Sequence, residues 1–145
     1  MNIRDRVVEL RRVKASELQP HPRNWRVHPK AQRAALEGIL GEVGYADALL
    51  ARQLPDGKLE LIDGHLRAET TPDMEVPVLI LDVSEDEANK LLLSLDPLAA
   101  MARSDSDQLE TLLAGVQTDN TALQRMIDGL ARGAGIGRAS CRERV

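Results

Sequence analysis

The hydrophobic pattern of the first half of the chain predicts strands and helices that alternate. Residues 7–15 predict a strand with a polar edge. An apolar stripe at helical spacing follows Pro29 and predicts a helix that Gly44 ends. Two short apolar segments, 46–53 and 58–63, predict neighbouring strands joined by a Pro-Asp-Gly turn. This alternation indicates a small α/β domain.

The pattern continues with a second helix, a strand and a third helix. Gly64 breaks the strand before it, and a short helix is expected to follow. Residues 76–83 are apolar nearly throughout, which predicts a strand buried on both faces. Ser84 and Glu87 have the spacing of a capping box. They open a helix that we expect residues 96–97, Asp-Pro, to interrupt.

Beyond Ser104 the pattern changes to two helical stripes with a polar break between them. The apolar positions of the stripes are Leu109, Leu112, Leu113 and Val116, then Leu123, Met126, Ile127 and Leu130. They predict a helical hairpin. We therefore expect a main domain over residues 1–103 and a helical extension over residues 104–135.

Residues 136–145 form a separate segment. They can be read as a translation of ATCGGAAGAGCGTCGTGTAGGGAAAGAGTG, which looks like the adapter used in short-read DNA sequencing. We interpret the segment as a sequencing artefact, and the alternative is a disordered basic tail. The only cysteine of the chain, Cys141, lies in it, so we expect no cysteine nucleophile.

Composition excludes some classes of protein. No apolar run approaches the roughly 20 residues that span a bilayer, so we expect no membrane partner. The N-terminus has no hydrophobic signal region, which makes the cytoplasm the expected compartment. Residues 1–33 carry a net charge of +6 and residues 34–135 a net charge of −12. The basic segment indicates a local anion site or nucleic-acid patch; alternatively, its arginines (Arg4, Arg6, Arg11 and Arg12) form a solvated strand edge.

The turn at Gly64 is the first candidate site. A strand that turns on glycine into a helix presents free backbone N–H groups, which attract phosphate or carboxylate. Arg67 can bind a phosphate with two hydrogen bonds. In the alternative interpretation, Gly64 is only a turn and Arg67 only a surface charge.

The proline-rich loop before the first helix is the second candidate site. It places Asn24 and Arg26 on either side of Trp25. Trp25 could stack on a base or on an arginine, but we favour a role in plugging the core. His21 and His28 match no metal spacing, and we expect neither zinc nor haem.

The order of these elements and motifs resembles the ParB/sulfiredoxin-like domain. The resemblance covers about residues 7–103. It rests on His21-Pro22-Arg23-Asn24-Trp25-Arg26, Gly44, Asp56-Gly57, Ile62-Asp63-Gly64-His65-Leu66-Arg67-Ala68 and Val76-Pro77-Val78. It implies an α+β fold, with a small mixed sheet and flanking helices, followed by the C-terminal hairpin.

The resemblance also implies a nucleotide site. In chromosome-partitioning ParB proteins the turn reads G-E-R-R and cradles the triphosphate of CTP with magnesium. Here it reads Gly64-His65-Leu66-Arg67, so the glycine and the last arginine match. Sulfiredoxin has a reactive cysteine where His65 stands, so we expect no sulfiredoxin activity. By the same resemblance, Asn24 and Arg26 match loop positions that face the phosphates.

Two residues of the turn have alternative roles. His65 could contact phosphate or shuttle a proton, or it could be a neutral residue that holds the turn, and we favour the contact slightly. Asp63 could bind Mg²⁺ beside a nucleotide, or it could cap the helix with its side chain, which we favour.

The sequence therefore predicts a nucleotide- or phosphate-binding domain of bacterial or phage DNA metabolism. Its role would be in partitioning or as an accessory to DNA modification. The expected ligand is a nucleoside triphosphate with Mg²⁺, and the candidate partners are DNA, a DNA methyltransferase and a second copy of the chain. Residues 93–102 look like the stretch that follows this domain in phage and bacterial ParB-like proteins. The alternatives are an enzyme of the same fold, such as a weak NTPase or nuclease, and a non-catalytic adaptor that uses the hairpin.

Overall fold

The computed structural model describes residues 1–136. They form two compact units, one made of residues 1–27 and 45–99 and the other of residues 28–44 and the described residues from 100 on. The tail predicted at 136–145 lies, apart from its first residue, outside the described residues. Within the described part, no helix is both long and apolar enough to cross a bilayer.

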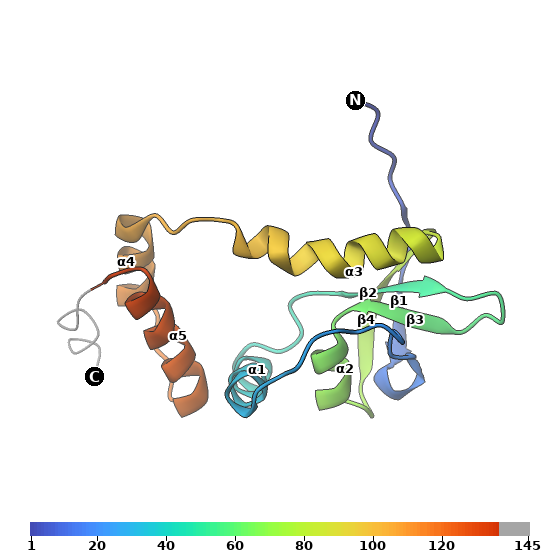
Figure 1. The fold of residues 1–145 in the computed structure, drawn as a ribbon. Helices are drawn as coiled ribbons and strands as arrows, with labels where there is room; N and C mark the ends of the chain where they lie inside the picture. The colour runs from blue at the N-terminus through green and yellow to red at the C-terminus, as the bar shows by residue number, and fades with distance from the viewer. Residues whose placement is uncertain (137–145) are drawn as a thin grey trace. The chain divides into compact units, whose positions relative to one another are not determined.

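The first unit is built on a mixed four-stranded sheet (Figure 1). Its strands are β1 (Val7–Lys14), β2 (Leu49–Gln53), β3 (Leu59–Asp63) and β4 (Glu75–Leu81), in the order β1-β4-β2-β3. β4 pairs antiparallel with β1 and parallel with β2, and β2 pairs antiparallel with β3. The predicted α+β fold with a small mixed sheet is thereby confirmed.

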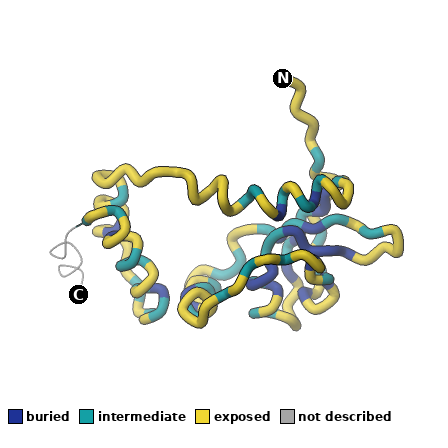
Figure 2. Tube along the Cα trace, viewed as in Figure 1, coloured by how far each residue is buried: buried dark blue, intermediate teal, exposed yellow. Residues whose placement is uncertain are grey.

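Both faces of this sheet carry buried apolar side chains. Figure 2 colours the buried residues along the chain trace dark blue. The 3₁₀ turn η1 (Ala15–Glu17) and the short helix α2 (His65–Thr70) pack on one face. The helix α3 (Glu85–Ala100) packs on the other. β4 contributes Val78 to the first face and Leu81 to the second, which confirms the strand predicted to be buried on both sides.

The β2–β3 hairpin also forms as predicted. The backbone N–H of Leu54 donates to the carbonyl of Lys58 over 2.8 Å. Gly57 adopts a φ of 88° in the turn, a conformation that favours glycine. β2 begins at Leu49, three residues later than the pattern suggested.

The capping box that opens α3 is confirmed, but the predicted end of this helix was wrong. The Ser84 N–H donates to Glu87 Oε1 over 3.0 Å, and the Glu87 N–H donates to Ser84 Oγ over 3.2 Å. The helix then continues through Pro97 to Ala100. A proline removes one helical hydrogen bond, and because Pro97 lies in the last, exposed turn, the loss affects only the end of the helix.

The second unit contains three helices: α1 (Lys30–Glu42), α4 (Ser106–Gly115) and α5 (Thr121–Gly133). α4 and α5 follow each other at the predicted positions, and α5 packs against α1 as well as α4. Asn120 caps α5 by accepting the N–H of Leu123 at 2.9 Å. The domain boundary between residues 103 and 104 stays a prediction.

Gly38 lets α1 approach the capped end of α5. A Cβ at this position would lie 2.5 Å from Asn120 Oδ1 and 2.6 Å from its Cγ. The amide cannot move away freely, because it holds the cap of α5. The contact between these two helices therefore depends on the missing side chain.

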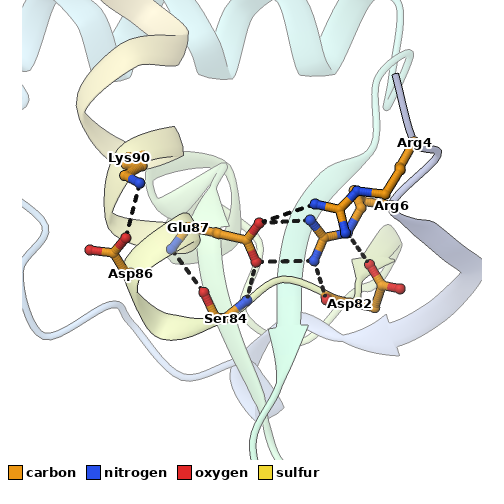
Figure 3. A network of polar contacts seen from close by, with 7 residues as sticks. All are labelled: Arg4, Arg6, Asp82, Ser84, Asp86, Glu87 and Lys90. Carbon is orange, nitrogen blue, oxygen red and sulfur yellow. Dashed lines mark hydrogen bonds and ion pairs between the residues drawn. The ribbon is translucent and has the colours of Figure 1, made fainter. Parts of the chain in front are cut away.

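An ion-pair network fixes the start of β1 to the first turn of α3 (Figure 3). Arg6 Nη1 lies 2.7 Å from Glu87 Oε2, and Arg6 Nε lies 2.7 Å from Asp82 Oδ1. The guanidinium also donates to the Asp82 carbonyl over 2.8 Å. The hydrogen bond from Arg6 lowers the pKa of Glu87 to about 2, helped by the backbone N–H of Ser84. Arg6 is thus a structural residue.

We predict that Gly38→Ala destabilises the second unit. The added methyl group collides with Asn120, and overpacking of this kind costs about 1–3 kcal/mol. Gly41→Ala is the matched control, because the same helix has open space there, and alanine should stabilise the helix interior by about 0.5–1 kcal/mol. Urea unfolding of both variants measures the difference. Equal stability of the two variants would contradict the packing described.

We predict an acid-sensitive contribution from Glu87. Its folded pKa lies below the ordinary value of 4.5, so its charged form stabilises the fold above about pH 4.5. That contribution should disappear as the pH falls from 4.5 towards 2. Glu87→Gln keeps a capping side chain but removes the charge, so its unfolding free energy should vary less with pH over this range. Glu85→Gln serves as the control, because Glu85 lies in the same first turn of α3 and forms no ion pair with the described residues. Identical acid profiles for wild type and Glu87→Gln would refute the prediction.

Candidate functional site

Gly64 forms the turn between β3 and α2, and the turn needs glycine for two reasons. Its φ of 99° lies in the left-handed region. In addition, a Cβ here would lie 2.6 Å from Cγ of Leu49, which is fully buried in the sheet. The turn therefore lies directly against the core, with no room for a side chain.

Arg67 is held beside this bare turn. Its Nη2 atom lies 3.2 Å from the position that a Cβ on Gly64 would occupy. Its side chain is 16% exposed, so it is not a plain surface charge. The Tyr45 hydroxyl donates to the Arg67 carbonyl over 3.0 Å, which anchors the backbone of α2. The guanidinium is thus positioned before any ligand arrives.

Two carboxylates flank the guanidinium. Asp47 Oδ2 lies 3.5 Å from Nη1, and Asp63 Oδ2 lies 3.5 Å from Nη2. Both distances exceed the roughly 2.7–2.9 Å of a strong charge-assisted hydrogen bond. The expected role of Asp63 as a helix cap was wrong: Gly64 is the capping residue of α2, and no side chain caps it. Asp63 instead faces Arg67.

His65 joins the turn to the proline-rich loop. Its Nε2 atom accepts the backbone N–H of His21 over 3.0 Å. His21 in turn accepts the N–H of Arg23 at Nδ1 over 3.0 Å, and its carbonyl accepts the N–H of Asn24 over 3.1 Å. Because Nε2 is an acceptor here, this geometry favours the neutral, turn-holding role of His65. The two predicted halves of the site are tied together by these bonds.

A buried polar group beneath the loop was missed by the sequence interpretation. The His21 side chain is 2% exposed, and its Nε2 lies 3.7 Å from Glu60 Oε1, too far for a hydrogen bond. Glu60 also receives Arg52 Nε at 3.2 Å. Because Glu60 lies between Leu59 and Leu61, the alternating pattern of the strand predicts that its side chain faces solvent. It is buried because Gln19 pairs alongside β3.

The loop itself is attached to α3. Arg26 forms an ion pair with Asp96, and its guanidinium lies 5.0 Å from the ring centre of Trp25. Trp25 Nε1 donates to the Leu92 carbonyl over 3.2 Å. Trp25 is 53% exposed, so the favoured core-plug role was wrong and stacking on an arginine was the correct alternative. The backbone N–H of Asn24 donates to the His21 carbonyl, whose own backbone N–H is bonded to His65 of the turn.

The charge balance of the site limits its chemistry. Around the turn, one guanidinium faces two carboxylates, and the second cation, Arg26, is engaged by Asp96. Among the described residues, no group of three or more His, Cys, Asp or Glu side chains could hold a metal ion. A metal at this turn would therefore need ligands brought by another molecule.

We predict that Gly64→Ala destabilises the first unit more than Gly57→Ala does. Both positions have a left-handed backbone, which costs a side chain about 1–2 kcal/mol. Only position 64 adds a collision with Leu49, because nothing lies within 4 Å of a Cβ at Gly57. Overpacking should add about 1–3 kcal/mol at position 64. Thermal unfolding of the two variants checks this, and a smaller loss for Gly64→Ala would disprove the tight turn.

Comparison with known proteins identifies the fold. No protein-family model matches the sequence, and no curated protein matches it. Among solved structures, the chain is similar to the C-terminally truncated chromosome-partitioning protein ParB from Caulobacter crescentus, complexed with CTP-gamma-S. The match has a TM-score of 0.59 and 17% sequence identity, and it covers 92% of this chain and 75% of that one. The chain therefore has the ParB/sulfiredoxin-like fold that its sequence resembles.

Proposed function

We propose that the first unit binds the phosphates of a nucleoside triphosphate between the Gly64–Arg67 turn and the Asn24–Arg26 loop. The observation that carries the proposal is the position of Arg67, whose largely buried guanidinium lies beside the glycine turn at Gly64. A preorganised guanidinium can form a forked pair with a phosphate. The turn at Gly64 packs tightly on Leu49, which gives the backbone next to Arg67 a fixed position. The structurally similar ParB binds a CTP analogue, which supports the same class of ligand here.

The ligand should enter as its magnesium complex. Asp47 and Asp63 together outweigh the charge of Arg67, so a free triphosphate would meet net repulsion at the turn. Mg²⁺ is typically held by phosphates with one or two carboxylates. Asp63, which is more buried than Asp47, is the carboxylate we propose to face the metal. No hydrolysis is part of the proposal.

Arg26 provides a way for ligand binding to change the contacts of α3. If a phosphate attracts its guanidinium, the pair with Asp96 of α3 breaks. The loop would then hold α3 only through the bond from Trp25 to Leu92. We propose that α3 and the residues after it respond to the nucleotide in this way. The likeness to a chromosome-partitioning protein supports a role in DNA metabolism.

Isothermal titration calorimetry with CTP, ATP and GTP, with and without Mg²⁺, tests this proposal. We expect one nucleotide to bind only with Mg²⁺. Arg67→Ala should weaken that binding about tenfold or more, because a hydrogen bond to a charged group contributes about 1.5–3 kcal/mol. Arg67→Lys should restore it only in part, since lysine cannot form the fork.

Lys90→Ala is the matched control. It removes a cation from the same unit, on an exposed side chain paired with Asp86, and should bind as the wild type does. The proposal fails if no nucleotide binds, or if Arg67→Ala binds as tightly as Lys90→Ala.

A further inference from the structure

A basic groove lies in the first unit and shares no residue with the Gly64 site. Its volume is about 760 Å³. The end of β1, the segment that follows it, and the start of β3 form its walls. The lining includes four basic side chains, Arg11, Arg12, Lys14 and Lys58, and two acidic ones, Glu17 and Glu75. The groove is therefore positive, although the whole chain is negative.

Three of the four cations are available to a ligand. Arg11 pairs with Glu9 of the same strand. Arg12, Lys14 and Lys58 form no ion pair within the part of the chain that the structure describes. Arg12 and Lys14 are exposed, so their charged ends are in water. Arg6 differs from them, because its guanidinium is paired with Glu87 of α3.

The walls of the groove are fixed by backbone hydrogen bonds. The N–H of Ser16 donates to the Pro72 carbonyl over 2.9 Å. The N–H of Gln19 donates to the Leu59 carbonyl, and the N–H of Leu61 to the Gln19 carbonyl, both over 2.8 Å. Leu18, on the same segment, is buried in the sheet core. The groove is thus preformed and needs no ordering of the chain when a ligand binds.

We propose that this groove binds the phosphate backbone of a nucleic acid. Arg12 and Lys14 are two residues apart on one strand, a separation of about 6.6–6.8 Å. This exceeds the rise of roughly 3.4 Å per phosphate along the axis of one DNA strand, so the two side chains can contact different phosphates. Lys58, across the groove, supplies a third contact. No aromatic side chain lines the groove, so bases are not stacked and the binding is independent of sequence.

Fluorescence anisotropy with a labelled 20-nucleotide single strand, and with its duplex, tests the proposal on the full chain. We expect binding at about 50 mM salt that weakens as salt rises. The triple variant Arg12→Gln, Lys14→Gln, Lys58→Gln should bind the single strand at least tenfold more weakly. The slope of log K against log salt should become shallower by about 2, since each of three phosphate contacts contributes about 0.7. Circular dichroism establishes that the variant is folded.

Three comparisons keep the result specific. Lys90→Gln removes a cation outside the groove and should leave the affinity within twofold of the wild type. Arg67→Ala should also leave it unchanged, so that failure of the nucleotide proposal and failure of this one are distinguishable. Polyglutamate and tripolyphosphate, added at the same concentration of negative charge as unlabelled strand, should displace the labelled strand less well than the unlabelled strand does.

The proposal is overturned if neither strand nor duplex binds, or if a folded triple variant binds as the wild type does. Equal competition by polyglutamate would assign the groove to an acidic polypeptide instead. Equal competition by tripolyphosphate would assign it to free phosphates.

Discussion

The contact between Gly64 and Leu49 determines how the candidate site is built. Leu49 is fully buried in β2, and it occupies the space that any side chain at position 64 would need. The turn therefore lies against the sheet, and α2 begins beside the core. From there Arg67 returns over the turn, where Asp47 and Asp63 flank its guanidinium. A looser turn would leave the cation without a fixed position.

The same first unit connects the turn to α3 through polar contacts. His65 holds the backbone at His21, and the loop that follows reaches α3 through Arg26 and Trp25. At its other end, α3 is joined to β1 by the pair between Arg6 and Glu87. Polar side chains thus attach both ends of α3, while its apolar face packs on the sheet. Only the Arg26 attachment adjoins the candidate phosphate site, so it is the one that a ligand could exchange.

Local patterns predicted most of the fold, because hairpin turns, capping boxes and glycine breaks depend on neighbouring residues. Tertiary contacts decided the rest. Asp63 turned to Arg67 instead of capping α2, and Trp25 stacked on Arg26 instead of entering the core. Glu60 has the alternation of a solvent-facing residue, and only the pairing of a distant segment buries it. The sequence placed Gly64 and Arg67 in one turn, but not Asp47, whose approach to Arg67 depends on the path of the chain into β2.

The central claim is that one ligand contacts both the Gly64 turn and the Asn24–Arg26 loop. Backbone amide shifts in nuclear magnetic resonance, followed as CTP, ATP or GTP is added with Mg²⁺, test it most directly. The account predicts that one of these nucleotides shifts the amides of 64–67 and 24–26 together, with the same saturation curve. Shifts confined to one of these segments, or absent from both, would contradict it.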